Sequence, residues 1–417
     1  MLQKTLSRLI QYGKLTVIGP DGTKSDFGQV PADAPQLDVI VRLKGVLTPT
    51  KIAVYPDLYL GKCYMDGALV IEKGSLWDLL DLCGRNLPPK STTRRNCLVR
   101  TTKAILRRLQ QRNSLHGARC NVAHHYDLSN ILYEEFLDTD LQYSCAYFSG
   151  PQLSLAEAQD AKKRHIAAKL LLKPGQRVLD IGCGWGGLAL SLAQFENVHV
   201  LGITLSPAQL TVAQNRARQA GLEQRVKFAL LDFREINEQF DRIVSVGMFE
   251  HVGTPHYPEF FRIVSRLLTE DGVALIHSIG RKDGPGMTSA WIRKYIFPGG
   301  YIPALSEVVP TIEHSGLWIS DLEILRLHYA ETLRYWREAF LANREKLSRI
   351  YDERFCRMWE FYLAVSEMSF RFGGLMVFQA QLARRIDAVP LTRDYMFNCE
   401  RHTCETHRPR VVRSTSS

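Results

Sequence analysis

The sequence predicts an α/β protein built on a parallel, doubly wound sheet, with a smaller strand-rich domain in front of it. Three observations predict this fold. Short alternating runs fill the first 83 residues, strand-like and helical segments alternate from about residue 126, and the apolar run at 177–181 stops at a glycine-rich elbow that continues as a helix. Ligands bind such sheets at the carboxyl ends of the strands, so we expect the functional residues there.

The N-terminal region has the pattern of short strands separated by turns. Strand-like runs occur at 39–43, 52–55 and 68–71, and turn residues occupy 20–22 and 65–67. We therefore expect a small α+β domain, rich in strands, over residues 1–83.

The larger domain, expected over residues 121–395, alternates strands with helices. Strands are predicted near 177–181, 199–203, 226–230, 241–246 and 272–278, and helices near 187–195, 207–220 and 258–268. An aromatic insert from about 280 to 318 follows the fifth strand. We expect it to form a lid over the strand ends, with ordinary loop packing as the alternative. Helix should dominate from there to about 386, before a polar tail at 396–417.

The composition is that of a globular intracellular enzyme. Of 417 residues, 45% are hydrophobic and 23% charged. No run of about 18 apolar residues could span a bilayer, and no signal segment follows Met1, so we expect a cytoplasmic protein. Nine cysteines without paired spacing indicate reduced thiols. Cys399, His402, Cys404 and His407 have a spacing that would suit zinc, but they lie in the polar tail, where a frayed terminus is the preferred interpretation. No metal site is therefore expected.

The net charge of +10 is concentrated in one segment. Between Leu82 and Tyr126 there is no Asp or Glu, and ten Lys and Arg residues lie between positions 85 and 119. Apolar residues recur among them at helical spacing, which predicts a basic amphipathic helix within a connector at 84–120. Such a helix suits an anionic membrane surface, and a solvated interdomain helix is the equal alternative.

The glycine-rich elbow at 182–187 predicts a nucleotide-type ligand. Gly182, Gly184 and Gly187 satisfy the dinucleotide fingerprint, but that match alone has low specificity. Asp180 lies in the strand end where dinucleotide-binding chains usually keep an apolar residue. No acid ends the second strand at 201–206, where a ribose ligand is expected. S-adenosylmethionine is therefore favoured over NAD and over a purely structural turn.

Nucleic acid is another polyanion that the basic segment could meet. Methylases of exocyclic amines usually carry an Asn/Asp-Pro-Pro-aromatic stretch after the fourth strand to hold a flipped base. Residues 245–253 contain no such stretch. We expect no nucleic-acid partner.

Several separated motifs make the chain resemble the cyclopropane-fatty-acyl-phospholipid synthases, which include enzymes similar to mycolic acid cyclopropane synthases. The motifs lie at 126–130, 143–148, 178–190, 202–209, 249–253, 296–300 and 329–333. Residues 56–67 also resemble the N-terminal domain of the members that act on phospholipids. The resemblance implies a Rossmann-like class I methyltransferase fold and an enzyme that transfers a methylene from S-adenosyl-L-methionine across the cis double bond of phospholipid acyl chains.

The resemblance also implies the cofactor residues. Tyr143 and Ser144 should close over the methionine end, and Phe233 with Arg234 should border the adenine. The floor and the ribose side should be formed by Asp180, Gly182, Gly184, Trp185, Gly186, Thr204, Leu205, Ser206 and Gln209.

The chemistry that the resemblance implies needs a base. Attack of an alkene on the sulfonium methyl leaves a carbocation, from which a proton must be lost. In the family the base is thought to be a bicarbonate held by a cysteine backbone, a glutamate, a histidine and a tyrosine, which correspond here to Cys145, Glu250, His277 and Tyr329. Glu250 is a poor packing residue and needs a partner, whereas His277 by itself would more often be a core histidine.

Aromatic residues are expected to assist by stabilising the cation and excluding water. The candidates are Tyr147, Phe148, Tyr295 and Phe297. Ser366 occupies a position where many family members carry a cysteine, so a covalent mechanism through that thiolate is excluded. The substitution leaves open a diverged paralogue with a methyl-branched product.

The expected protein is thus a cytoplasmic methyltransferase, peripherally bound to the inner face of the membrane through residues 85–119. A small-molecule methyltransferase and a lipid-binding protein with a vestigial site are the alternatives. A homodimer is left open.

Overall fold

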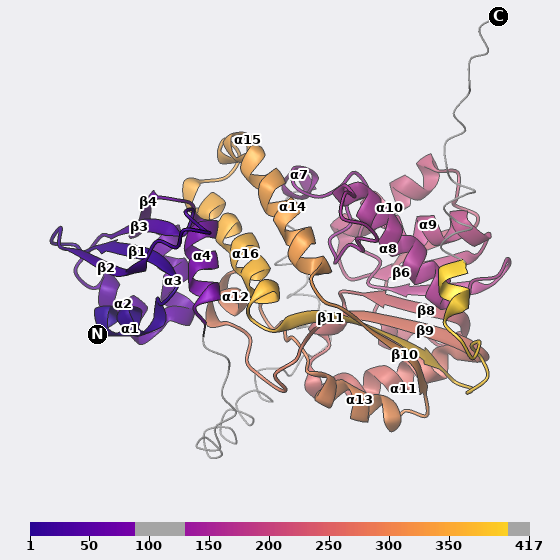
Figure 1. Cartoon of the computed structure of the whole chain (residues 1–417). Helices are drawn as coiled ribbons and strands as arrows, with labels where there is room; N and C mark the ends of the chain where they lie inside the picture. Colours follow the sequence, from indigo (N-terminus) through magenta and orange to yellow (C-terminus); the bar gives the residue numbers. More distant parts are fainter. Residues whose placement is uncertain (88–129, 399–417) are drawn as a thin grey trace, which may run out of the picture.

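The computed structural model describes residues 1–87 and 130–398, which form two sheets joined by a helical layer (Figure 1). The larger sheet has seven strands in the order β10-β11-β9-β8-β5-β6-β7. Its five parallel strands are those that the sequence predicts: β5 (Arg177–Ile181), β6 (His199–Thr204), β7 (Val226–Leu230), β8 (Phe240–Val246) and β9 (Leu268–Arg281). The doubly wound α/β fold is therefore confirmed.

Helices cover both faces of this sheet, and each face has its own hydrophobic core (Figure 1). One face is covered by α8 (Leu155–Leu170), α9 (Gly187–Glu196) and α10 (Pro207–Gln219), and the other by α11 (Tyr257–Leu267) and α13 (Leu305–Glu313). Strands covered on both faces bury consecutive apolar residues, as at Val178 and Leu179 in β5 and at Ile243 and Val244 in β8.

The glycine elbow after β5 depends on backbone conformations that disfavour side chains. Gly182 and Gly186 both have φ of 84°. A Cβ on Gly186 would lie 2.6 Å from the ring of Phe228, so this glycine allows α9 to begin directly against β7.

The prediction of helix as far as residue 386 is wrong at two places. β10 (Trp318–Leu325) and β11 (Leu375–Ala383) add an antiparallel edge to the sheet beside β9. The segment 375–383 is rich in Met, Leu, Ala and Gln, which favour helix, but pairing with β9 along nine residues overrides that preference. Helices α14 (His328–Ala342), α15 (Arg344–Ser348) and α16 (Glu353–Arg371) do fill the interval between the two strands.

The N-terminal domain contains more helix than strand. Its sheet has the order β2-β1-β3-β4, and its elements are α1 (Leu2–Leu9), β1 (Gly13–Ile18), β2 (Lys24–Gln29), β3 (Asp38–Leu43), α2 (Thr48–Val54), α3 (Pro56–Met65), β4 (Leu69–Lys73) and α4 (Leu76–Arg85). The strand predicted at 52–55 is wrong, because residues 48–54 form α2. Pro49 favours a helix start at its first turn, and Pro56 forces Tyr55 out of helical geometry before α3 begins.

The predicted connector helix and the Cys/His tail lie outside the described residues. The connector expected at 84–120 falls almost entirely within 88–129, and the tail beyond residue 398 is likewise outside the described ranges.

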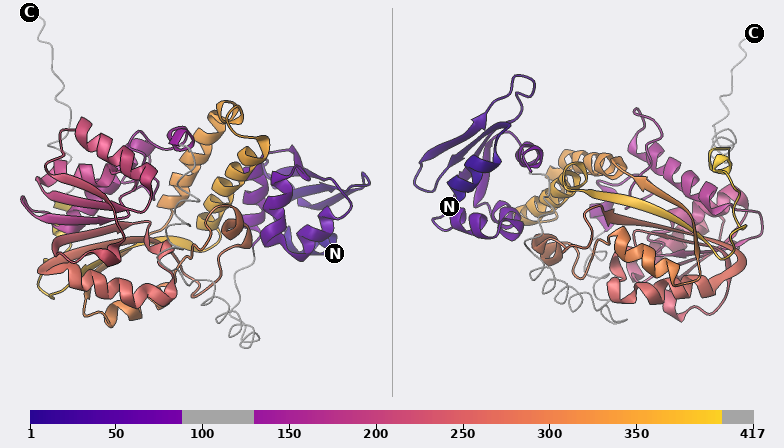
Figure 2. Two further views of the ribbon diagram at one scale, coloured as in Figure 1. Left: turned by 180° about the vertical axis from the view of Figure 1, so that it is seen from behind. Right: turned by 60° about the horizontal axis from the view of Figure 1, so that its bottom comes forward.

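A helical layer joins the N-terminal domain to the sheet domain (Figure 2). One hydrophobic core contains Met65 and Leu76 from the first domain together with Trp336 and Trp359 from α14 and α16. The insert contributes α12 (Ala290–Tyr295), which packs against α3. A Cβ on Gly61 would lie 2.6 Å from Trp291 Nε1, so the insert and the N-terminal domain approach each other as closely as a glycine permits.

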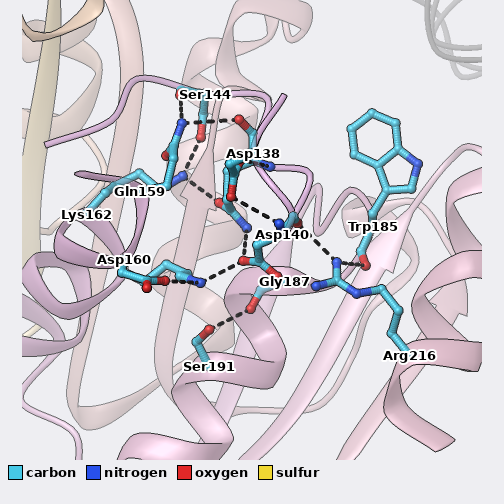
Figure 3. A network of polar contacts seen from close by, with 12 residues as sticks. Asp138, Asp140, Ser144, Gln159, Asp160, Lys162, Trp185, Gly187, Ser191 and Arg216 are labelled. Carbon is cyan, nitrogen blue, oxygen red and sulfur yellow. Dashed lines mark hydrogen bonds and ion pairs between the residues drawn. The ribbon is translucent and has the colours of Figure 1, made fainter. Parts of the chain in front are cut away.

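The loop at 138–148, between α7 (Asn130–Glu134) and α8, is held by a buried polar network (Figure 3). The Lys162 ammonium, which is 0% exposed, donates to Gln142 Oε1 at 2.5 Å and to Ser144 Oγ at 2.8 Å. Asp140 pairs with Lys163 at 2.7 Å and with Arg216. Fixed by Lys162 and Lys163 of α8 and by Arg216 of α10, the loop accommodates Leu141 at φ 55°, in the left-handed region.

Burial lowers the pKa of Lys162 to about 8, although Asp138 and Asp140 act in the opposite direction. An unfolded lysine titrates near 10.4, so the unfolded chain holds more protons between about pH 8 and 10. Stability contributed through Lys162 therefore rises with pH in that window.

We expect the free energy of unfolding of the wild type to increase relative to Lys162→Met between about pH 7.5 and 9.5, by on the order of 1–2 kcal/mol. Urea unfolding of both proteins at the two pH values measures this change. Lys173→Met, at an exposed lysine, is the matched control and should show no such trend. A difference between wild type and Lys162→Met that does not change with pH would contradict the assignment.

Candidate active site

Two adjoining cavities open at the carboxyl ends of the parallel strands. The first, here called the glycine-loop cavity, encloses about 170 Å³ beside the elbow at 181–188. The second, the insert cavity, encloses about 410 Å³ between the strand ends, the insert at 279–302 and α16. Tyr143, Ser144, Gly247 and His251 line both, so the two spaces meet at these four residues.

Most of the predicted cofactor residues line the glycine-loop cavity. They are Tyr143, Ser144, Asp180, Gly182, Gly184, Trp185, Thr204, Leu205, Gln209, Phe233 and Arg234. Gly186 and Ser206 are not among its lining residues. Gly186 packs against Phe228 and Ala213, and the Ser206 hydroxyl accepts from Gln209 N–H as the cap of α10. Their contribution is to the backbone that shapes the cavity.

Asp180 is a buried carboxylate at the floor of the glycine-loop cavity. It ends β5, is 1% exposed, and its Oδ2 has no hydrogen-bond partner within the described residues. Burial raises the pKa of Asp180 to about 7, and the nearby Lys162 opposes that shift. A desolvated carboxylate with an unpaired oxygen is costly unless a cation or a hydrogen-bond donor meets it. The cavity floor is therefore suited to a ligand that carries positive charge.

The end of β6 and the segments that follow β6 and β7 supply further polar side chains to the glycine-loop cavity, and these are paired with one another. Thr204 Oγ1 donates to Gln209 Oε1 at 3.0 Å, which leaves the Gln209 amide nitrogen for other partners. Arg234 forms a two-point contact with Asp232 at 2.8 and 2.7 Å and lies 5.4 Å from the Phe233 ring. Asp232 was not predicted. Its place at the start of a short 3₁₀ turn directly after β7 is the signal that could have identified it.

The insert cavity is lined by all four predicted catalytic residues: Cys145, Glu250, His277 and Tyr329. Cys145 comes from the 138–148 loop, Glu250 from the 3₁₀ turn Phe249–His251 after β8, His277 from β9 and Tyr329 from the first turn of α14. Four segments that are far apart in sequence thus meet in one space.

Glu250 is held through one carboxylate oxygen only. Its Oε1 accepts from Ile279 N–H at 2.6 Å, while Oε2 is buried without a hydrogen-bond partner in the described part of the chain. Burial raises the pKa of Glu250 to about 7. The carboxyl group is therefore close to half-ionised at neutral pH and can exchange a proton with a neighbour.

His277 is a neutral imidazole. Burial lowers its pKa to about 3, and the positive charges of Lys162 and Lys169 act in the same direction. The Gln379 amide lies 3.1 Å from His277 Nδ1 and fixes the ring, which leaves Nε2 for a partner in the cavity. His251, which lines both cavities, is also neutral because burial lowers its pKa to about 4.

The Cys145 thiol is not an activated nucleophile. Its side chain is 1% exposed, and burial raises the pKa of the thiol far above its usual value. The adjacent Ala146 N–H donates to Thr332 Oγ1 at 3.0 Å, so the backbone here is fixed against α14. Ser366, the residue at the family cysteine position, also lines the insert cavity.

The predicted set of cation-stabilising aromatics is wrong in part. Tyr147 stacks between His165 and His328, with ring centroids 4.2 and 5.0 Å apart, and lines neither cavity; Phe148 and Tyr295 do not line either cavity. Phe297 does line the insert cavity. The aromatic residues that join it there are Tyr143, Tyr301, Tyr329, Tyr362 and Phe370. Periodicity cannot identify them because they come from four separate segments.

Within residues 1–87 and 130–398, no group of three His, Cys, Asp or Glu side chains could hold a metal ion. None of the helices in these ranges combines the length and apolar composition that crossing a bilayer requires.

The sequence is similar to those of known lipid-modifying enzymes. Residues 113–380 match the model of the mycolic acid cyclopropane synthetase family. A cyclopropane-fatty-acyl-phospholipid synthase from Escherichia coli is 43% identical over 263 residues, which cover 63% of this chain and 67% of that protein. A probable fatty acid methyltransferase from Pseudomonas putida is 34% identical over 371 residues and covers 86% of this chain and 89% of its own length.

A solved structure of a mycolic acid cyclopropane synthase complexed with SAH and CTAB superposes with a TM-score of 0.60. The two sequences are 34% identical, and the superposed region covers 63% of this chain and 97% of the chain in the solved structure. The fold, the glycine-loop cavity and these matches agree. The chain belongs to the mycolic acid cyclopropane synthetase family and is an S-adenosylmethionine-dependent methyltransferase.

Proposed function

We propose that this enzyme transfers a methylene from S-adenosylmethionine across the cis double bond of an unsaturated acyl chain in a membrane phospholipid. The observation that carries the proposal is the meeting of the two cavities at Tyr143, Ser144, Gly247 and His251. A sulfonium bound in the glycine-loop cavity would face the insert cavity, whose wall is largely apolar and contains the buried pair Glu250 and His277. An acyl chain is apolar along its length, so it matches the largely apolar wall of this cavity.

The reaction makes two demands on the insert cavity. The alkene carbons attack the sulfonium methyl, the carbon–sulfur bond breaks, and a carbocation forms on the chain. Water must be kept away, because it would trap the cation as an alcohol. Aromatic faces such as those of Phe297 and Tyr362, whose ring centroids are 5.9 Å apart, attract positive charge without acting as nucleophiles.

Loss of a proton from the transferred methyl closes the cyclopropane ring. The residues present fit a bound bicarbonate, because the buried Glu250 Oε2 has no described hydrogen-bond partner and His277 is neutral. Cys145 through its backbone, Glu250, His277 and Tyr329 would hold it, and when bound it supplies a weak base. The Ile279 N–H fixes the Glu250 carboxylate, and the Gln379 amide fixes the His277 ring, so both side chains are oriented for this role.

A methyl-branched product is the second candidate. A hydride shift in the same cation, followed by loss of a different proton, gives a chain that keeps one double bond and carries a methylene group or a methyl branch. The relative named a probable fatty acid methyltransferase, which aligns along most of this chain, and Ser366 in the insert cavity support this candidate.

We propose peripheral attachment to the inner membrane face through basic residues 85–119 as the way the enzyme reaches its substrate. Their positive charge supports this proposal, since each Lys or Arg near an anionic surface contributes about 1 kcal/mol.

Incubation of the purified enzyme with S-adenosylmethionine and vesicles of unsaturated phospholipids should yield acyl chains that gain one methylene and resist mild hydrogenation. Mass spectrometry before and after hydrogenation measures both properties. The same gain with a retained double bond would favour the methyl-branching candidate, and absence of any gain would refute action on phospholipid acyl chains.

Asp180→Asn should weaken binding of S-adenosylmethionine by about tenfold or more, because the ligand carries an ammonium and a sulfonium that a buried carboxylate can meet. Binding of a cation favours the ionised carboxylate, so the pKa of Asp180 should fall from about 7 and protons should be released near pH 6.5. Titration calorimetry in two buffers of different ionisation enthalpy measures this release.

The exposed control Glu223→Gln should leave both the affinity and the proton release unchanged. Proton release that persists in Asp180→Asn would show that another group titrates.

Activity should fall in bicarbonate-depleted buffer and recover when bicarbonate is added. Glu250→Gln should lower kcat by at least about a hundredfold and should abolish the response to bicarbonate, with the affinity for S-adenosylmethionine unchanged. At saturating cofactor, kcat/KM of the wild type should rise with pH through about 7 as Glu250 ionises, and this rise should be absent from the variant. Indifference of the wild type to bicarbonate would refute this assignment.

A further inference from the structure

The insert cavity changes chemical character from its floor to its mouth. Glu250 and His277, at 8% and 2% exposure, lie at the buried end. Asp57 and Asp283, which line the same cavity, are exposed, and Arg281 is partly exposed. The lining also includes an apolar section, formed by Ile279, Ile292, Phe297, Leu333, Met368 and Leu375, beside the hydroxyl side chains of Thr288, Ser289, Ser366 and Ser369. The cavity thus combines a polar buried end, an apolar section and a charged, exposed mouth.

Strand β9 shows how far the charged mouth lies from the buried end of the cavity. His277, Ile279 and Arg281 alternate along the strand, so they share one face, and all three line the cavity. Four residues of extended strand span about 13 Å. Arg281 therefore lies about that far along the strand from the proposed reacting position, toward solvent.

Arg281 is anchored at its Nε, and its Nη atoms form no hydrogen bond with another described residue. Its Nε donates to Ile302 O at 3.1 Å, and its guanidinium lies 5.9 Å from the Tyr301 ring. A Cβ on Gly286 would lie 1.6 Å from Arg281 Nη1, so the guanidinium packs directly against this glycine. In the described ranges no carboxylate forms an ion pair with Arg281, and it is the one Lys or Arg among the described residues that line the cavity.

The two carboxylates at the mouth come from different parts of the fold. Asp57 belongs to α3 of the N-terminal domain, and its Oδ2 accepts from Ala290 N–H at 2.7 Å at the start of α12. Asp283 follows β9 and lies near Gly374, where a Cβ would be 3.2 Å from its Oδ2. Among the described residues that line it, the mouth therefore combines one cation with two anions.

We propose that this mouth is a headgroup site for zwitterionic phospholipids that carry a primary amine. The Arg281 guanidinium binds the phosphodiester through two N–H donors, and Asp57 with Asp283 binds the ammonium. The inference rests on the proposed function, which places the acyl chain in the apolar section. Among lipids with the same acyl chains, an amine headgroup satisfies both charges, whereas a glycerol headgroup satisfies only the arginine. A quaternary ammonium lacks the N–H donors that a carboxylate accepts.

Kinetics on vesicles tests the site. With the same acyl chains, wild type should prefer phosphatidylethanolamine to phosphatidylglycerol. Arg281→Gln should raise KM about tenfold for both lipids, as expected for loss of a charged hydrogen bond. Asp283→Asn should remove the preference by raising KM for the amine lipid alone. Asp57→Asn keeps an oxygen for Ala290 N–H and should act in the same way.

Lys282→Gln is the matched control, because Lys282 is an exposed cation beside Arg281 that does not line the cavity. It should leave the lipid preference and KM unchanged, and thermal melts confirm that each variant is folded. Equal KM values for wild type and Arg281→Gln, or equal lipid preference in wild type and Asp283→Asn, would overturn the proposal.

A binding measurement separates this inference from the proposed reaction. Short-chain phosphatidylethanolamine and free phosphoethanolamine are titrated into the full chain by calorimetry. Lipid binding that depends on Arg281, without any methylated product, would sustain the headgroup site and refute the proposed function. Product formation that is insensitive to Arg281→Gln would sustain the proposed function and refute the headgroup site. Equal affinity for free phosphoethanolamine would assign the mouth to a soluble phosphate ester and overturn the lipid assignment.

Discussion

The position of the 138–148 loop is the constraint on which both cavities depend. This loop places Tyr143 and Ser144 on the wall that the two cavities share. A buried ammonium on α8, Lys162, holds it by donating to Gln142 and Ser144. Removing an ammonium from water is costly, and it is tolerated here because its donors are used on two loop side chains. The same charge lies close enough to Asp180 and His277 to affect the pKa of each.

Each cavity contains one buried carboxylate with an unpaired oxygen. Asp180 ends β5 in the glycine-loop cavity, and Glu250 follows β8 in the insert cavity; burial raises the pKa of both to about 7. A protein stabilised only by packing would gain from apolar residues at these positions. Their retention at the carboxyl ends of neighbouring strands fits ligands that satisfy them: a sulfonium cofactor in the first case and the proposed proton acceptor in the second.

The N-terminal domain is part of the site as well as a neighbour of it. Its core continues into the helical layer through Met65 and Leu76, and Gly61 lets α3 contact the insert at Trp291. Asp57 caps α12 and reaches the mouth of the insert cavity. Because the insert is held between this domain and α16, movement of one would shift residues of the cavity wall. This arrangement gives the domain a physical route to influence the shape of the insert cavity.

The sequence by itself determined the parallel strands and the glycine elbow, because short-range signals such as apolar runs and glycines at 182–187 specify them locally. Its resemblance to a known family supplied the candidate cofactor and catalytic residues, most of which line the two cavities. It did not determine the antiparallel edge, since 375–383 becomes strand only by pairing with β9. Nor did it determine that 52–55 ends a helix, or that Tyr147 stacks between two histidines away from the cavities. Tyrosines 301 and 362 and the charged mouth of Asp57, Arg281 and Asp283 were also decided by tertiary structure. These groups come from segments far apart in the chain, and only packing between domains brings them to one surface.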